Sequence, residues 1–404
     1  DSYSFVDSVM ETPLPTYGFD YSLVRSADID TAYNALITYV IPGSPAEAAG
    51  LERGNWIMKV DTSYISKKYE TQLLQGTQAR DLVMGVWKEV PVEPEEGEEG
   101  EEEFVYKVVP NDITLKLPAA RSVEDNPVHK TKILTVKENN RDIKVGYLMY
   151  NSFTAGTKAE PEKYNNELRS VSQKFKEAGV QAVILDLRYN EGGSMDCVQL
   201  LGTILTSAER LGEPMAYLEY NDKNTDKDAT ILFGTDREIN LDLHSLIAIT
   251  SGTTMGAPEM LIRSLFLEDT YPIATVGSST KGQNVATEQF INEEFLWSVN
   301  PVVCTVYNSQ HDTYGAISPA TDLKVSETTI DGSTNYSEFL PFGTFDKDGK
   351  SERLLKIAIG ILDGTYPPKD DETPEESTTQ TRFKVEKSVS SPASRRFSSK
   401  GLRL

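Results

Sequence analysis

The stretch that decides the fold is Gln181-Ala-Val-Ile-Leu-Asp-Leu-Arg-Tyr-Asn-Glu-Gly-Gly193. Its first half is a continuous apolar run, which is typical of a strand buried on both faces, and its second half is a polar turn that ends in Gly-Gly. Helical patterns surround it at 160–178 and 195–205, so strand and helix alternate. These segments predict an α/β core, in which a mixed or parallel sheet is covered by helices.

A second strand-to-helix turn follows the same plan. Leu246–Thr250 has the pattern of a buried strand, and Ser251-Gly-Thr-Thr-Met-Gly-Ala-Pro-Glu259 leads from it into a helix. Because ligands of α/β sheets gather beyond the carboxyl ends of strands, we expect backbone N–H groups of Gly192 and Gly193 to face a site there. Gly256 stands at the elbow, where other folds mount a nucleophile, but a glycine has no side chain to offer. The alternative interpretation is a pair of ordinary turns.

The part of the chain before this pattern is richer in short β-type runs. Two of them, 81–87 and 104–109, surround a stretch that holds nine Glu and no Lys or Arg between residues 89 and 103. Like-charge repulsion and low hydrophobicity predict that 89–103 is a solvated hairpin loop. We therefore expect a small β-rich module over 17–117.

The remaining boundaries follow from composition. The α/β core is predicted over 118–368, and 1–16 is interpreted as the remnant of a leading segment. Residues 369–404 are polar and rich in Ser and Thr. We expect this tail to be partly mobile, with a candidate edge strand at 381–385.

Composition excludes several classes of function. The 404 residues carry 40 Lys and Arg against 62 Asp and Glu, a net charge of −22, which argues against binding to nucleic acid or to an anionic membrane surface. No apolar run approaches the ~18 residues of a membrane helix, so no transmembrane segment is predicted. Cys197 and Cys304 are expected to be separate buried thiols, and the three histidines lie far apart in sequence. No metal site or other cofactor is predicted.

Several motifs together resemble one family. Their order along the chain is Gly43–Ile57 (GSPAEAAGLERGNWI, similar to the PDZ pattern GSPAxxAGLxxGDxI), Ile184–Gly193 (similar to LDLRxNxGG), Leu246–Glu259 (similar to NGxSASASE), Val276–Val285 (similar to VGxxTxGKxxV) and Leu354–Gly364 (similar to LLxxALxxIxG). The chain resembles the carboxyl-terminal processing, or tail-specific, serine peptidases, whose members carry a PDZ module ahead of an α/β core. The resemblance implies a ClpP/crotonase-like mixed sheet and an extracytoplasmic location, periplasmic or surface-anchored, as for a lipoprotein.

The resemblance also implies a site. In that family a lysine held neutral activates a serine nucleophile. By position the nucleophile falls on Gly256 and the base on Gln283, so both roles are vacated. The parts of the site that survive are Glu259 and the backbone oxyanion donors Gly192 or Gly193 and Ala257. This pattern predicts a pseudoenzyme that binds peptide or protein C-termini without hydrolysing them.

Peptide binding would follow the PDZ mode, in which a peptide adds as a strand beside a loop that holds its carboxylate. Tyr17-Gly18-Phe19 resembles that loop; the alternative is an ordinary turn. Two other functions stay open. One is an active serine-type endopeptidase that pairs Thr253 or Thr254 with Lys281. The other is a structural or assembly component.

Overall fold

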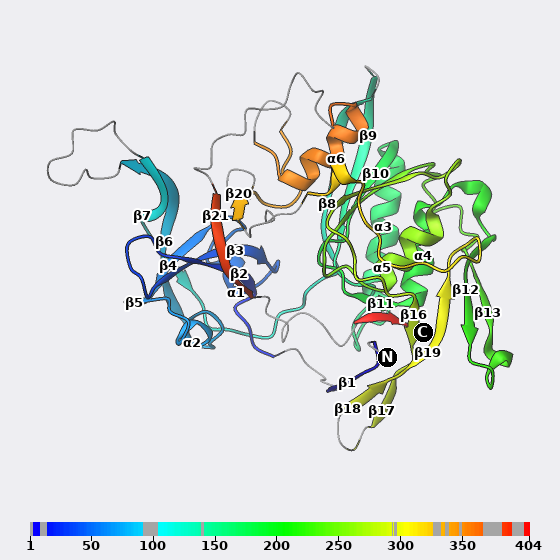
Figure 1. Cartoon of the computed structure of the whole chain (residues 1–404), viewed down its shortest axis with the longest axis horizontal. Coiled ribbons are helices and arrows are strands. Elements are labelled where there is room, and N and C mark those ends of the chain that lie inside the picture. The colour runs from blue at the N-terminus through cyan, green and yellow to red at the C-terminus, as the bar shows by residue number, and fades with distance from the viewer. Residues whose placement is uncertain are drawn as a thin grey trace.

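The structure is a computed structural model that describes residues 3–8, 14–91, 104–138, 141–292, 294, 297–325, 333–335, 339–346, 350–366, 382–389 and 400–404. In this part of the chain the strands form four sheets, and they divide between two lobes (Figure 1). The β-rich lobe holds β2 to β7 with β20 and β21. The α/β lobe holds the other strands and the four helices α3 to α6.

The central sheet of the α/β lobe is ordered β15-β14-β10-β9-β8. Its members are β8 (Val128–Glu138), β9 (Arg141–Tyr150), β10 (Val180–Asp186), β14 (Leu246–Thr250) and β15 (Ile273–Gly277). Four of them run parallel, and β8 pairs with β9 in the antiparallel direction. The predicted mixed sheet is confirmed.

Helices cover both faces of this sheet, as the apolar run of β10 requires. Val183 and Leu185 lie in the larger core, with side chains from three helices, whereas Ala182 and Ile184 lie in a second core with the fourth. The three helices on the first face are α3 (Lys163–Glu177), α4 (Met195–Leu205) and α5 (Ala257–Leu265), and the fourth is α6 (Arg353–Asp363). Alternate residues of one strand thus serve two cores.

A second sheet of the α/β lobe lies against the first core. It is ordered β11-β22-β16-β19-β12-β13, with β11 at Gly192–Ser194, β12 at Pro214–Tyr220, β13 at Ala229–Leu232, β16 at Val285–Thr287, β19 at Val302–Tyr307 and β22 at Gly401–Arg403. β22 runs parallel to both of its neighbours. The sequence pattern did not predict this strand, because it lies in a polar, Lys- and Arg-containing tail.

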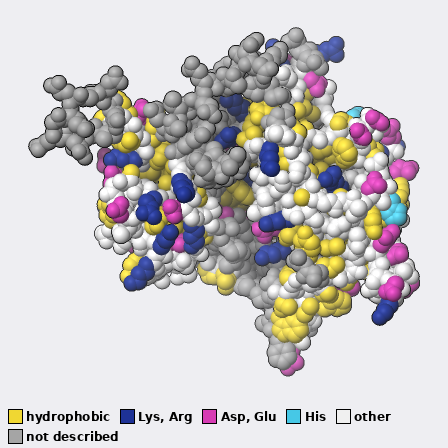
Figure 2. Space-filling view, in the orientation of Figure 1, with side chains coloured by type: hydrophobic (Ala, Val, Ile, Leu, Met, Phe, Trp, Pro, Cys, Tyr) yellow, Lys and Arg dark blue, Asp and Glu magenta, His cyan; other side chains and the backbone are white. Residues whose placement is uncertain are grey.

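A small three-stranded sheet stands at one end of this lobe. It is ordered β1-β18-β17, with β1 at Phe5–Ser8, β17 at Phe290–Asn292 and β18 at Trp297–Asn300. Within the leading segment 1–16, residues Phe5–Ser8 form a strand that completes this sheet. Figure 2 shows hydrophobic surface at this end of the molecule, where Val6, Phe290, Ile291 and Trp297 are exposed.

The sheet of the β-rich lobe is ordered β20-β21-β2-β3-β4-β6-β7, and β5 pairs with β4. The bounds are β2 Phe19–Arg25, β3 Tyr33–Val40, β4 Trp56–Val60, β5 Ser63–Tyr64, β6 Arg80–Pro91, β7 Phe104–Leu117, β20 Ser333–Asn335 and β21 Arg382–Val389, with short helices α1 Pro45–Ala48 and α2 Glu70–Leu74. The strand predicted at 381–385 of the tail is present as β21, but it is not at the edge of the sheet. It lies between β2 and β20.

The predicted hairpin between 81–87 and 104–109 is confirmed, but it is longer than expected. Glu89, Val90 and Pro91 belong to β6 because they pair with Tyr106, Val105 and Phe104, which satisfies backbone groups that a loop would leave to water. The prediction of a loop over 89–103 is therefore wrong for residues 89–91, which belong to β6. Residues 92–103 lie outside the described part of the chain, as do 367–381 and 390–399 of the predicted tail. No helix in the described residues is long and apolar enough to cross a membrane.

Candidate active site

The elbow before α5 has the conformation that its glycine permits. Gly256 has φ 71° and ψ −101°, in the left-handed region that L side chains rarely adopt. A Cβ built on Gly256 would lie 2.5 Å from the Gly401 carbonyl carbon, 2.5 Å from the Leu402 nitrogen and 2.7 Å from Gln283 Oε1. A side chain at the elbow would therefore displace its neighbours.

The same contacts locate Gln283 beside the elbow. Gln283 lies between β15 and β16, and its side chain is 2% exposed. Its Oε1 is buried and has no hydrogen-bond partner among the described residues. The structure thus brings together the two positions that the resemblance assigns to nucleophile and base. The first position, Gly256, offers only its backbone N–H, and the second, Gln283, offers a side-chain amide.

Glu259 connects these two positions. Its carboxylate is fully buried and accepts hydrogen bonds from the Gly256 N–H (2.8 Å) and the Gln283 N–H (2.9 Å) at one oxygen. The other oxygen accepts from the Gly282 N–H (2.5 Å) and from the Thr280 hydroxyl. Charged acceptors make stronger hydrogen bonds than neutral ones, so Glu259 fixes the elbow against the loop that carries Gln283.

The Gly-Gly turn approaches the same residue, Gly401, as the elbow does. Gly192 and Gly193 have φ 128° and 136°, and a Cβ on either would collide with backbone oxygen, that of Gly401 at 1.8 Å and that of Phe153 at 2.2 Å. The Gly192 N–H donates to Asn190 Oδ1 at 3.0 Å. Both glycines are therefore needed for close approach of other chain segments. The third predicted oxyanion donor, Ala257, follows the elbow as the first residue of α5 and is buried.

The threonine hydroxyls that an active enzyme would need as nucleophiles donate hydrogen bonds to backbone carbonyls. Thr254 is fully buried and its hydroxyl donates to the Leu187 carbonyl (2.9 Å). The Thr253 hydroxyl donates to the Arg188 carbonyl (2.9 Å). Lys281 is exposed, and its backbone N–H donates to the Thr254 carbonyl (3.0 Å). The structure brings these residues near the elbow without joining a threonine hydroxyl to the lysine ammonium.

The predicted carboxylate loop lies far from the elbow, at the start of β2 in the β-rich lobe. Gly18 has φ 84°, and its N–H donates to Thr16 Oγ1 at 3.0 Å. Tyr17 and Phe19 point into the core of this lobe and are almost fully buried. This loop leads into β2, and β21 pairs with β2.

A buried ion network was not predicted from the sequence. Arg188 lies between Asp186, 2.8 Å away, and Glu352, 2.8 Å away, and all three side chains are buried. Arg53 of the β-rich lobe adds a 3.7 Å contact to Glu352 and donates to the Leu340 carbonyl. Burial by itself would raise the pKa of the Glu352 carboxyl, but Arg188, supported by Arg53, holds that pKa below its ordinary value.

The network joins the two lobes through the contact of Arg53 with Glu352. A signal for it was available, because an Asp and an Arg at the end of a fully apolar strand require partners when buried. The partner could not be read from the sequence, since Arg188 and Glu352 are 164 residues apart.

The described residues offer no cluster of three or more His, Cys, Asp or Glu that could hold a metal ion. Cys197 and Cys304 are unpaired and buried. Burial raises the pKa of the Cys197 thiol to about 12 and that of Cys304 to about 11. Both thiols are thus protonated near neutral pH and are poor nucleophiles.

Comparison with known proteins agrees with this architecture. The family model of peptidase family S41 matches residues 144–299, which include the Gly-Gly turn, the elbow and Gln283. The crystal structure of a Bacteroides fragilis NCTC 9343 protein assigned to the S41 proteases is 39% identical. Its TM-score is 0.76, and the alignment covers 90% of this chain and 87% of that one.

A second solved structure, the photosystem II D1 C-terminal processing protease, is 16% identical with a TM-score of 0.41 over 81% of this chain and 78% of that one. No match was found among curated proteins. The Bacteroides fragilis structure is similar in sequence and in fold over most of its length, which confirms the predicted family relationship. The chain belongs to peptidase family S41.

Proposed function

We propose that this S41 member binds extended peptides, including protein C-termini, and does not hydrolyse them. The observation that carries the proposal is the contact between Gly256 and Gln283 at the elbow. Glycine offers no hydroxyl to attack a carbonyl, and a glutamine amide does not take up a proton at pH 7. The hydroxyls of Thr253 and Thr254 are held by backbone carbonyls. These facts favour binding over catalysis.

The binding edge in this proposal is β2. An extended segment already adds to it, since β21 pairs with β2 in antiparallel register from Tyr21↔Val389 to Val24↔Val385. In this register Val389, the last residue of β21, lies opposite Tyr21, so β21 itself runs toward the Gly18 loop, as a PDZ-bound peptide would run. An external peptide would replace β21 on the same edge.

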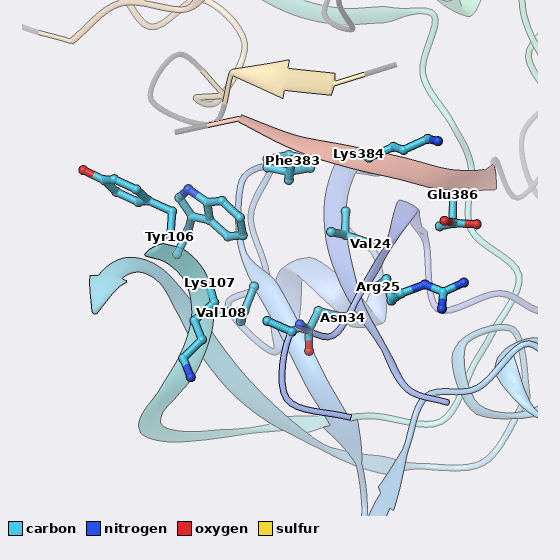
Figure 3. A pocket seen from close by; sticks show the side chains of 11 residues that line it. Val24, Arg25, Asn34, Tyr106, Lys107, Val108, Phe383, Lys384 and Glu386 are labelled. Atoms are coloured by element: carbon cyan, nitrogen blue, oxygen red, sulfur yellow. The ribbon is translucent and has the colours of Figure 1, made fainter. Parts of the chain in front are cut away.

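Side chains of β21 indicate what such a peptide needs. Phe383 packs edge-on against Trp56 and Trp87, with ring centroids 5.0 and 5.3 Å apart. Figure 3 shows Phe383 above a hollow that Val24 and Tyr106 also line. A peptide with an aromatic side chain at the position of Phe383 would gain the same packing.

The test for hydrolysis compares the parent chain with Gly256→Ser plus Gln283→Lys on unstructured polypeptides. We expect no cleavage by the parent, and activity that appears in the double variant would indicate an otherwise intact site. Lys281→Ala is the matched control. Cleavage by the parent that is lost in Lys281→Ala would overturn the non-catalytic proposal in favour of a relocated dyad.

The test for C-terminus binding uses a chain in which β21 is loosened by Phe383→Ala. Peptides with free and with amidated C-termini are titrated against it and against the parent. We expect the free peptide to bind more tightly, and the variant to bind more tightly than the parent. Equal affinity for the two peptides would remove carboxylate capture from the proposal. The extracytoplasmic location implied by the resemblance is also a prediction, which fractionation of producing cells tests.

A further inference from the structure

We propose that the channel between β11 and β16 is a second peptide-binding site, selective for a glycine followed by a leucine, and that residues 400–404 are its resident ligand. This inference goes beyond the proposed function, which concerns the β2 edge. It depends on the described contacts of β22 and holds whether or not the elbow is catalytic.

Backbone pairing holds the ligand on both sides. Residues 401–403 align with 192–194 of β11, and Leu402 and Arg403 align with residues of β16. The Gly401 N–H donates to the Glu191 carbonyl (2.6 Å), and the Leu404 N–H donates to the Thr287 carbonyl (3.0 Å). Figure 1 shows the segment as the short red strand beside β11 and β16. These bonds use no side chain of the ligand.

The peptide bond between Gly401 and Leu402 lies over the elbow. Its carbon and its nitrogen are each 2.5 Å from the position of a Cβ on Gly256, and its oxygen is 1.8 Å from that of a Cβ on Gly192. The carbonyl thus points to the Gly-Gly turn while the amide faces the elbow. A scissile bond needs this orientation between a nucleophile and oxyanion donors. The resident segment therefore occupies the position of a substrate.

Gln283 determines the residue that fits opposite it. A Cβ on Gly401 would meet the Gln283 amide at 2.5 and 2.6 Å, and Gly401 has φ 76°, which disfavours any L side chain. Gln283 Oε1 is buried, faces this position and has no hydrogen-bond partner within the part of the chain that the structure describes. Any other residue here would have to displace the Gln283 amide and adopt a positive φ, so the channel favours glycine at this position.

Leu402 supplies the apolar part of the recognition. It is 1% exposed and belongs to the larger core of the α/β lobe, together with Ala286 and Ala257. The residues on either side of the pair are less buried: Lys400 is exposed, and Arg403 makes a 3.5 Å contact to Gln289 Oε1. Specificity thus rests on the Gly-Leu pair.

The test measures amide exchange of Gly401, Leu404 and the β16 residues in the full chain. In Gly401→Ala and in Leu402→Asp we expect these amides to exchange at least about tenfold faster than in the parent. Lys400→Ala, which changes an exposed side chain beside the pair, is the matched control and should behave as the parent. Unchanged exchange in both channel variants would overturn the proposal.

Adding a peptide to the variants distinguishes two causes of faster exchange, an emptied channel and a damaged fold. The labelled peptides are Ser-Lys-Gly-Leu-Arg-Leu and its Gly→Ala analogue, both amidated so that carboxylate capture at β2 cannot contribute. The first should bind Leu402→Asp, restore protection of β16 and bind the parent at least about tenfold more weakly. Equal binding of the two peptides would refute glycine selectivity. Failure of the first peptide to restore protection would refute the assignment of residues 400–404 as the ligand.

Concentration tests the source of the ligand. If residues 400–404 fold back within one chain, protection of Gly401 is independent of protein concentration. Protection that falls on dilution together with a change from dimer to monomer would show that a second copy donates the strand, and would overturn the intramolecular assignment. Failure of these tests leaves the cleavage and C-terminus titrations unaffected, so the two proposals fail separately.

Discussion

β21 and β22 come from the same tail, but they are held in different ways. β21 is antiparallel to β2, and its Phe383 packs in a small aromatic cluster of the β-rich lobe. β22 is parallel to both neighbours, and its Leu402 lies in the main core of the α/β lobe. The position of β21 depends mainly on side-chain packing, whereas that of β22 depends mainly on the space available to its backbone.

This difference teaches which changes each site tolerates. Aromatic packing at β21 accepts substitutions that preserve volume. At Gly401 an added side chain would have to displace the Gln283 amide and adopt a positive φ, which disfavours every residue but glycine. The β2 edge should therefore bind varied peptides, and the β11–β16 channel very few.

The largest effect is expected at the buried ion network that connects the two lobes. Arg188→Leu leaves Asp186 and Glu352 buried without their common partner, which should lower the free energy of unfolding by about 3–5 kcal/mol. Denaturant titration measures the loss. The control is Arg141→Leu, at an exposed position. A loss below about 1 kcal/mol would contradict the central role given to the network.

A selective break of β21 comes next. Phe383→Ala removes a ring that is 5% exposed and touches Trp56 and Trp87, at a cost of about 3 kcal/mol in local stability. We expect amides of β2 to exchange faster while Gly401 keeps its protection. Lys384→Ala is the neighbouring control. Equal loss of protection at Gly401 would mean that the two strands are released together.

Acid should weaken the join between the lobes. The pKa of the Glu352 carboxyl lies below its ordinary value of 4.5 in the folded chain, so its contribution is complete above 4.5 and is lost as the pH falls through the lowered pKa. The effect should be smaller than that of Arg188→Leu, because a protonated carboxyl still accepts hydrogen bonds. Unfolding free energies measured at pH 7 and at acid pH give the slope. In Glu352→Gln that slope should be shallower, and an unchanged slope would assign it to other carboxyls.

The smallest effect concerns the ion pair of β21. Lys387 Nζ lies 2.7 Å from Glu70 of α2, but the lysine side chain is half exposed. Glu70 is buried, but it keeps the Tyr21 hydroxyl and the Gln75 amide as hydrogen-bond donors, so Lys387→Ala should cost about 1 kcal/mol, and less at high salt. Lys67→Ala, which removes the 3.5 Å contact to Glu386, serves as comparison. A salt-independent loss would show that Lys387 acts by packing.

Regular elements of this fold were predictable where one local rule decided them. Met195–Leu205 and Leu246–Thr250 have the predicted bounds, because apolar periodicity and a Gly-rich turn specify both ends. The proximity of Gly256 to Gln283 followed from the family's motif order. β22 and the Arg188–Glu352 pair were not predictable. Each depends on segments that are far apart in sequence, and a Gly-Leu pair in a polar tail has no periodicity of its own.

The position of both strands on one chain has a consequence for competition. Ten residues, 390–399, separate β21 from Lys400. While β21 stays on β2, the Gly-Leu pair is tethered near its channel, and a short tether gives an effective concentration in the millimolar range. A free peptide of equal intrinsic affinity must reach a similar concentration to compete. A partner that first removes β21 from β2 would release that tether, so occupancy of the two peptide sites would be thermodynamically linked.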